Sequence, residues 1–308
     1  MTDYVYAGDL KGNLWRFDLT SATETMWAVT PGPLFTTTTN QPITTAIVAA
    51  SGAATPGGVQ QLMLLFGTGQ KTGITNTTGT TYAPNGQSLY GVWDWNMTNW
   101  NSLSAAHYLS LAAGSAGTLL QTNLQQQVVA LGSSGDIDMN TTAAVCWAGS
   151  STCSSGNNKY GWFINLPSTQ EQVVFNPGLV QQAFTVNSIV PAVNTPTACT
   201  NNTDTGFTYV VNALNGGAFR QVFLPPNQLN NGAVNTNPQY TDTNAVAMQT
   251  NATGSSFVTT NATGYSYLVY ETNQVQAGGS GSNLQGGTLG LNLPPNTTGH
   301  RVSWVELR

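Results

Sequence analysis

The sequence predicts an all-β fold and, within that class, a β-propeller. Three observations support this. Short strands rich in aromatic residues and ending on Asp or Asn recur along the chain. Glycine turns or Pro- and Gly-rich connections separate them, and the one weakly helical stretch is 102–113. Strand units that repeat every 40 to 50 residues, roughly, are typical of propeller blades. We therefore assign 1–308 to a single propeller or to the C-terminal part of one. The blade count, the closure of the ring by this chain alone, and a β-sandwich as the structural alternative stay open.

The opening segment, 3–19, is predicted to be a hairpin, with a turn at Asp9-Leu-Lys-Gly12. Glycine suits such a turn because it adopts positive φ at little cost. Trp15, Phe17 and Leu19 alternate with the residues between them, and this period of two predicts that they face the core. The residues given a structural role here are Gly8, Asp9, Gly12, Trp15, Phe17 and Asp18.

Further strands follow in order. The run 61–66 is apolar throughout and ends in glycines, which is typical of a strand buried on both faces. The segments 87–94 and 160–167 repeat the aromatic pattern, while 72–86 is a polar loop. The remaining expected strands or hairpins lie at 43–50, 206–217, 255–272 and 301–308. Asp9, Asp18 and Asp94 sit at strand ends, where a carboxylate commonly accepts backbone N–H bonds.

Composition excludes several classes of partner. Charged residues make up 6% of the chain, and the net charge is −5, against roughly 25% charged residues in an ordinary soluble domain. Without a basic run, binding to nucleic acid is excluded, and no apolar stretch is long enough to enter a membrane. A polar but weakly ionic surface favours a secreted or cell-surface protein. Since the N-terminus lacks signal-peptide features, we expect the chain to be part of a longer precursor.

The three cysteines are Cys146, Cys153 and Cys199. The spacing of Cys146 and Cys153 permits a small disulfide loop in an oxidising compartment and does not fit a zinc site. The sequence leaves that pairing open, and it gives no partner for Cys199.

Several segments, in order along nearly the whole chain, resemble the C-terminal propeller domain of the PilY family of type IV pilus tip-associated adhesins. They are Tyr4–Leu19, Gln41-Pro-Ile-Thr44, Phe66–Gly69, Gln87–Asp94, Tyr160-Gly-Trp162 and Arg301–Leu307. The chain departs from the family at Asn165, where Asp is typical, and at Gln170-Glu171-Gln172, where a Gly-Glu-Arg-like turn is typical.

The resemblance implies a propeller with quinoprotein-like blades that serves as a bacterial adhesin and a pilus assembly factor. Its implied partners are pilins or minor pilins and host or abiotic surfaces. Its implied location is extracellular, on the fimbrial tip or at the outer membrane after transit through the periplasm. Such a protein works by presenting loops from a rigid scaffold.

The resemblance also implies calcium in the full-length family, bound by an EF-hand-like loop. Asp3 corresponds to the last acid of that loop, and the other ligands would lie upstream. One carboxylate cannot supply the six to eight oxygens, roughly, that calcium takes, so we expect no tight calcium site in this chain. Asp136 and Asp138 alternate with other residues before Asn140 and form a second candidate cation site, although a polar turn is the commoner meaning of such a run.

Enzymatic chemistry finds little support. His107 and His300 stand outside any zinc or nucleophile motif and are expected on the surface. We therefore predict no catalytic residue and no residue that binds an organic cofactor. Two alternatives remain open: a carbohydrate-binding module that stacks sugars on exposed rings such as Trp95 and Trp100, and a quinoprotein-type dehydrogenase propeller.

Overall fold

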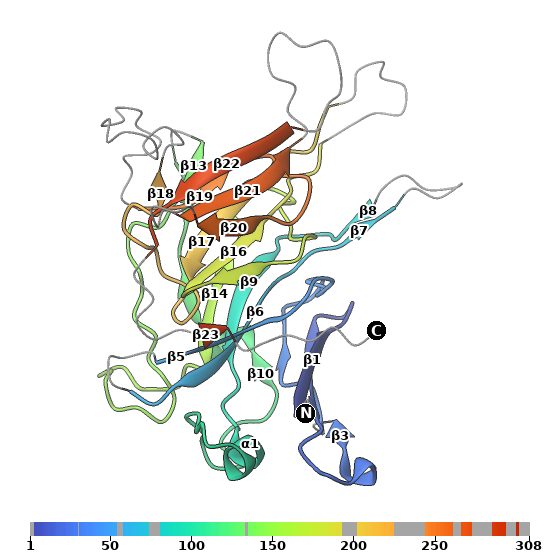
Figure 1. The fold of residues 1–308 in the computed structure, drawn as a ribbon, viewed down its shortest axis with the longest axis vertical. Helices are drawn as coiled ribbons and strands as arrows, with labels where there is room; N and C mark the ends of the chain where they lie inside the picture. The colour runs from blue at the N-terminus through green and yellow to red at the C-terminus, as the bar shows by residue number, and fades with distance from the viewer. Residues whose placement is uncertain are drawn as a thin grey trace.

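A computed structural model describes residues 3–29, 31–53, 58–73, 81–132, 135–192, 202–224, 244–260, 266–272, 285–293 and 300–301. These residues form four larger sheets and one two-stranded hairpin (Figure 1). The first sheet has the order β1-β2-β4-β10, with β3 also paired to β2. Its strands are β1 (Tyr4–Gly8), β2 (Asn13–Asp18), β3 (Ala28–Val29), β4 (Phe35–Thr36) and β10 (Leu119–Leu120).

The second and third sheets carry most of the core. The second has the order β11 (Gln125–Gln127), β14 (Gly161–Asn165), β9 (Ser88–Trp93), β6 (Gln61–Gly67), β5 (Val48–Gly52) and β23 (His300–Arg301). The third has the order β12 (Ala130–Leu131), β13 (Asp136–Asp138), β19 (Ala245–Gln249), β17 (Phe207–Asn212), β16 (Ala183–Asn187) and β15 (Gly178–Val180).

The fourth sheet has the order β18 (Phe223–Leu224), β22 (Gln285–Leu291), β21 (Ser266–Thr272) and β20 (Phe257–Thr260), and β7 (Lys71–Thr72) pairs with β8 (Thr81–Tyr82). Helix is scarce in the described chain: α1 (Thr98–Leu103) and the 3-10 turns η1 (Glu24–Met26) and η2 (Gln121–Asn123). The weakly helical stretch expected at 102–113 is wrong for most of its length, because the helix ends at Leu103.

The sheets follow one another as an open fan. In Figure 1 the first sheet lies at the lower right and the fourth at the top, with the second and third between them. The described sheets therefore form blades of a propeller-like array, and they do not close into a ring. The all-β prediction and the near absence of helix are confirmed.

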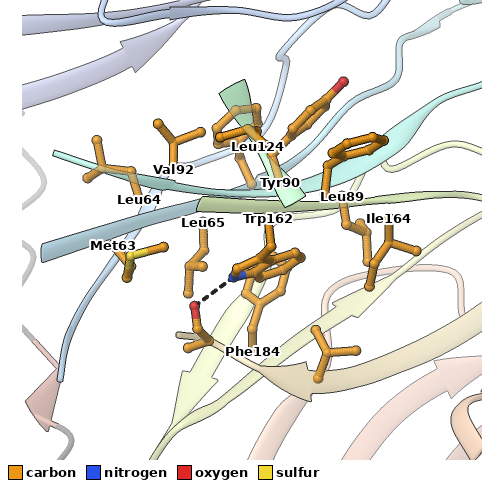
Figure 2. Packing of buried hydrophobic residues seen from close by; sticks show 14 of the residues in the cluster. Met63, Leu64, Leu65, Leu89, Tyr90, Val92, Leu124, Trp162, Ile164 and Phe184 are labelled. Atoms are coloured by element: carbon orange, nitrogen blue, oxygen red, sulfur yellow. Dashed lines mark hydrogen bonds between the residues drawn. The ribbon is translucent and has the colours of Figure 1, made fainter. Parts of the chain in front are cut away.

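The second sheet is buried on both faces, as predicted from its apolar run. All seven residues of β6 are buried. Toward the first sheet, the Tyr90 and Phe35 rings have centroids 5.1 Å apart, and toward the third sheet Trp162 and Phe184 are 6.3 Å apart. Figure 2 shows both faces, with Leu64, Val92 and Tyr90 on one side and Met63, Leu65 and Trp162 on the other.

A glycine makes room for the largest of these side chains. A Cβ atom at Gly91 would lie 2.3 Å from the Trp162 ring, which therefore lies directly over the strand. The indole Nε1 donates to the Ala213 carbonyl oxygen at 3.1 Å (Figure 2). This bond joins the second sheet to the turn after β17 in the third.

One short segment, residues 119–131, joins three sheets and is called the belt below. Its pieces β10, β11 and β12 form an edge strand of the first, second and third sheet in turn. The first two pair in parallel with their neighbours, β4 and β14. Gln127 is fully buried. Its Nε2 donates to the carbonyl oxygens of Ala143 and Asn215, and its Oε1 accepts the Ala143 N–H, each at 2.8 Å. The belt thus fastens the second sheet to loops beside the third.

The predicted inner face of the opening hairpin is wrong. Leu14 and Arg16 are buried, at 0% and 7% exposure, while Trp15, Phe17 and Leu19 are half-buried. The alternation is real, but the inner face carries an aliphatic side chain and a charge in place of the rings. The physical reason is that Arg16 meets a buried carboxylate from the second sheet.

Candidate functional site

The strongest polar constellation joins two of the segments that carry the family resemblance, the opening hairpin and the end of β9. Arg16 Nη1 lies 2.6 Å from Asp94 Oδ1, and their side chains are 8% and 0% exposed. Tyr6 donates its hydroxyl hydrogen to Asp94 Oδ2 at 2.7 Å, and Arg16 Nη1 also donates to the Asn96 carbonyl oxygen at 2.7 Å. Tyr6, Arg16 and Asp94 together are called the junction below.

The electrostatics of the junction favour an ionised pair. Burial raises the pKa of Asp94, and the Arg16 guanidinium and the Tyr6 hydroxyl oppose that rise. Burial lowers the pKa of Arg16, but the Asp94 carboxylate outweighs this and leaves it raised, so the guanidinium keeps its charge. A charge-assisted bond this short indicates that carboxylate and guanidinium face each other as ions.

Aromatic rings extend the junction toward the surface. The Arg16 guanidinium lies 5.1 Å from the Tyr4 ring centroid, within cation–π range. The ring centroids of Tyr4 and Trp100 of α1 lie 6.0 Å apart. Asn99 Nδ2, also in α1, donates to Asp18 Oδ2 at 2.8 Å. Burial raises the pKa of Tyr4 to about 12. The junction therefore holds α1 and the loop that precedes it against the hairpin.

The turn of the hairpin is organised by Asp9. Its carboxylate accepts hydrogen bonds from the backbone N–H groups of Lys11 and Asn13 and from the Trp15 indole at 2.8 to 2.9 Å. Burial pushes the Asp9 pKa up, but the bonds from Trp15 and Asn13 outweigh it and leave the pKa below its ordinary value. Gly12 has a φ of +81°, the left-handed conformation that its place in the turn predicts. Asp94 differs from Asp9, because its carboxylate pairs with a buried guanidinium in addition to a backbone hydrogen bond from Asn96.

The alternative of a sugar-stacking surface at Trp95 and Trp100 fails at one of the two rings. Trp95 is 5% exposed and belongs to the core. Trp100 is half-buried and is enclosed by the rings of Tyr4 and Tyr108. Trp95 therefore offers no free face to a sugar.

The two candidate cation sites belong to different segments, one before β1 and one in β13. Asp3 lies next to β1, and its carbonyl oxygen accepts the Leu19 N–H at 2.8 Å. The carboxylates of Asp136 and Asp138 both point toward the place where Gly132 would carry a Cβ atom. Within the described ranges, no three His, Cys, Asp or Glu side chains form a metal-binding group.

Glu171, which the sequence analysis noted only as part of a departure from the family pattern, is a buried acid that lies after β14. Glu171 Oε1 accepts bonds from the Ser188 hydroxyl at 2.6 Å and the Tyr209 hydroxyl at 2.8 Å, and Oε2 accepts the Ser168 N–H at 3.2 Å. Burial raises the Glu171 pKa, against the opposing effect of these bonds. These hydrogen bonds give Glu171 a structural role, together with Ser168, Ser188 and Tyr209. The sequence signal that could have revealed this group is an acid in an otherwise apolar and amide-rich stretch.

The other residues singled out from the sequence lie apart from the junction. Cys146 and Cys153 are joined by a disulfide, with Cα atoms 5.7 Å apart. Cys199 and the side chain of His300 lie outside the described residues, and His107 is exposed. No helix in the described part of the chain is long and apolar enough to cross a membrane.

Comparison with known proteins shows which proteins this chain resembles. Residues 1–134 match the PilY1 beta-propeller domain model, and that range contains the hairpin, the whole junction and the belt. Over residues 1–134 the chain is thus similar to the PilY1 β-propeller domain. The solved Pseudomonas aeruginosa PilY1 C-terminal domain aligns over 95% of the chain and 58% of its own length, at a TM-score of 0.60 and 21% identity. That likeness supports the fold.

Two curated relatives agree with this assignment. The type IV pilus biogenesis factor PilY1 from two P. aeruginosa strains, PAO1 and PAK, is 29% identical to the chain over 189 residues. The match spans 56% of this chain and 14% of the relative. The PilY1-type region thus corresponds to a small part of those proteins.

Proposed function

We propose that this chain is the propeller of a type IV pilus-associated factor, acting without catalysis in pilus assembly and adhesion. The observation that carries the proposal is the match of residues 1–134 to the PilY1 propeller, in relatives that are pilus biogenesis factors. Its partners would be pilins or minor pilins on one side and host or abiotic surfaces on the other. It would act outside the cell, at the pilus tip or on the outer membrane.

The structure supports a scaffold role in a specific way. The acids at its most elaborate polar sites serve packing: Asp9 holds a turn, Asp94 an ion pair and Glu171 two hydroxyls. Large apolar side chains are nevertheless exposed around η1 and β3, where Met26 is 70% and Trp27 47% exposed. A rigid core that presents such loops suits recognition better than chemistry.

The test is genetic and separates the two parts of the role. The gene is deleted in its own organism and complemented with the full-length wild-type protein or with a Met26→Ser/Trp27→Ser variant. We expect deletion to reduce surface pili and attachment, the wild type to restore both, and the variant to restore pili with weaker attachment. A matched Val59→Ser variant, which changes another exposed side chain, controls for general loss of apolar surface. Unchanged pili and attachment after deletion would overturn the proposal.

We also propose that 1–308 behaves as one unit and that this chain alone binds no calcium tightly. The belt and the pairing of β23 with β5 join distant parts of the sequence, which favours cooperative unfolding. For calcium, calorimetric titration of the purified chain should show no micromolar binding. Micromolar binding that disappears in Asp136→Asn would contradict this and assign the ion to that strand.

A further inference from the structure

A polar pocket at one end of the third sheet has no part in the role proposed above. Its described lining residues are Met139, Asn140, Thr142, Ala218, Arg220 and Asn244, around a volume of about 360 Å³. They come from three segments: the loop after β13, the chain after β17, and the residue before β19. A volume of this order is at the small end of ligand pockets, which span about 300–1,000 Å³.

Hydrogen bonds hold these three segments together. The Met139 N–H donates to the Asn244 carbonyl oxygen at 2.9 Å, and Asn244 Nδ2 lies 3.5 Å from Asn140 Oδ1. On the other side, the Ala218 N–H donates to Thr142 Oγ1 at 3.3 Å. The walls of the pocket are thus placed before any ligand arrives, which lowers the entropic cost of binding.

Arg220 gives the pocket its charge. Among the described residues the ion pairs are Arg16–Asp94 and Lys71–Asp204, and Arg220 takes part in neither. Its side chain is exposed, and the other described lining residues are neutral. Within the described part of the chain no acid is paired with this guanidinium, so it can face an anion at the rim of the polar hollow.

We propose that this pocket binds a carboxylated sugar, such as a uronic or sialic acid residue. A guanidinium pairs with a carboxylate through two parallel N–H bonds. The amides of Asn140 and Asn244 and the Thr142 hydroxyl can exchange hydrogen bonds with sugar hydroxyls. One cation matches one carboxylate, and the volume exceeds what a lone small anion would fill. The site stands independently of the pilus role, because binding needs only the purified chain.

The experiment compares three probes by calorimetry or saturation-transfer NMR on the purified chain. Glucuronate carries both sugar and carboxylate, glucose lacks the carboxylate, and acetylglycine lacks the sugar. We expect glucuronate to bind about ten-fold or more tightly than either of the others, since charge-assisted bonds and the hydroxyl contacts must act together.

Variants connect that preference to the pocket. Arg220→Gln should reduce glucuronate affinity to that of glucose, and Asn140→Asp should do the same by placing a carboxylate opposite the ligand. Lys11→Gln removes a cation from the exposed hairpin turn and should change nothing, and equal melting temperatures confirm that all variants fold. The proposal is overturned by absent binding, by glucose or acetylglycine binding as well as glucuronate, or by Arg220→Gln behaving like Lys11→Gln.

Discussion

Breaking the junction with Arg16→Met tests whether a buried ion pair holds the first sheet to the second. The substitution keeps much of the side-chain length but removes the charge that faces Asp94, whose side chain is fully buried. Removing one partner of a buried pair leaves the other charge uncompensated and costs about 3–5 kcal/mol. Since a domain is stable by only about 5–15 kcal/mol, this is a large share of the total.

Two further variants isolate the pair itself. In Arg16→Met/Asp94→Leu both charges are removed, so we expect much of the loss to be recovered, because an apolar pair can replace a buried ion pair at little cost. The single variant Asp94→Leu completes the cycle, because it leaves Arg16 without its carboxylate. Urea unfolding followed by tryptophan fluorescence gives each free energy, and the double-mutant cycle gives the coupling, which should be about 1 kcal/mol or more.

The matched control is the second ion pair of the described chain. Lys71 and Asp204 lie 3.2 Å apart with side chains 41% and 27% exposed, and exposed pairs contribute about 0–1 kcal/mol. Lys71→Met should therefore cost less than about 1 kcal/mol, and its effect should shrink in high salt. If Arg16→Met also costs less than about 1 kcal/mol, the junction is not what attaches the first sheet.

Three other predictions concern the core. Gly91→Ala places a methyl group 2.3 Å from a buried indole and should cost about 1–3 kcal/mol in urea unfolding, whereas Gly86→Ala, with nothing within 4 Å, should be neutral. For Glu171, burial raises the folded-state pKa above the ordinary 4.5, so the folded state holds the proton more tightly than the unfolded state. The free energy of unfolding of the wild type, relative to that of Glu171→Gln, should therefore fall as pH rises above about 4.5. A wild type that instead gains stability relative to Glu171→Gln over this range would contradict the prediction. Gln127→Ala leaves two carbonyls and one N–H of the belt contacts without partners and should cost about 2 kcal/mol or more, measured against the exposed Gln126→Ala, which should cost little.

The sequence predicts those parts of the fold that depend on local pattern. The apolar run in β6 and the aromatic strands β9 and β14 lie where they were expected, because burial on both faces leaves a continuous signal. The hairpin was located correctly, but its inner face was not. Period-two alternation shows that two faces differ, and hydrophobicity then favours the face with the rings. Here the buried carboxylate of Asp94, 78 residues from Arg16, reverses that choice, and no local pattern reports such a partner.

The belt was beyond sequence reasoning for a related reason. Its strands β10, β11 and β12 are two or three residues long, shorter than any periodicity can show. Their partners are also distant: β10 pairs with β4, and β11 pairs with β14. The Arg220 pocket was missed because its walls come from three separate segments that only the third sheet brings together.

The junction and the belt together explain how the first sheet, at one end of the fan, is kept in place. An end sheet has a neighbour on one side only, and its buried apolar side chains are few: Leu14 and Phe35 in its strands β2 and β4, and Leu119 in β10. A short apolar interface of this kind is poorly specified in orientation, because hydrophobic contact is not directional. An ion pair with defined geometry and an edge strand continuous with the next two sheets are both directional. The polar junction therefore sets the angle of the hairpin, and with it the surface that α1, η1 and β3 present, while the apolar contacts supply the attraction.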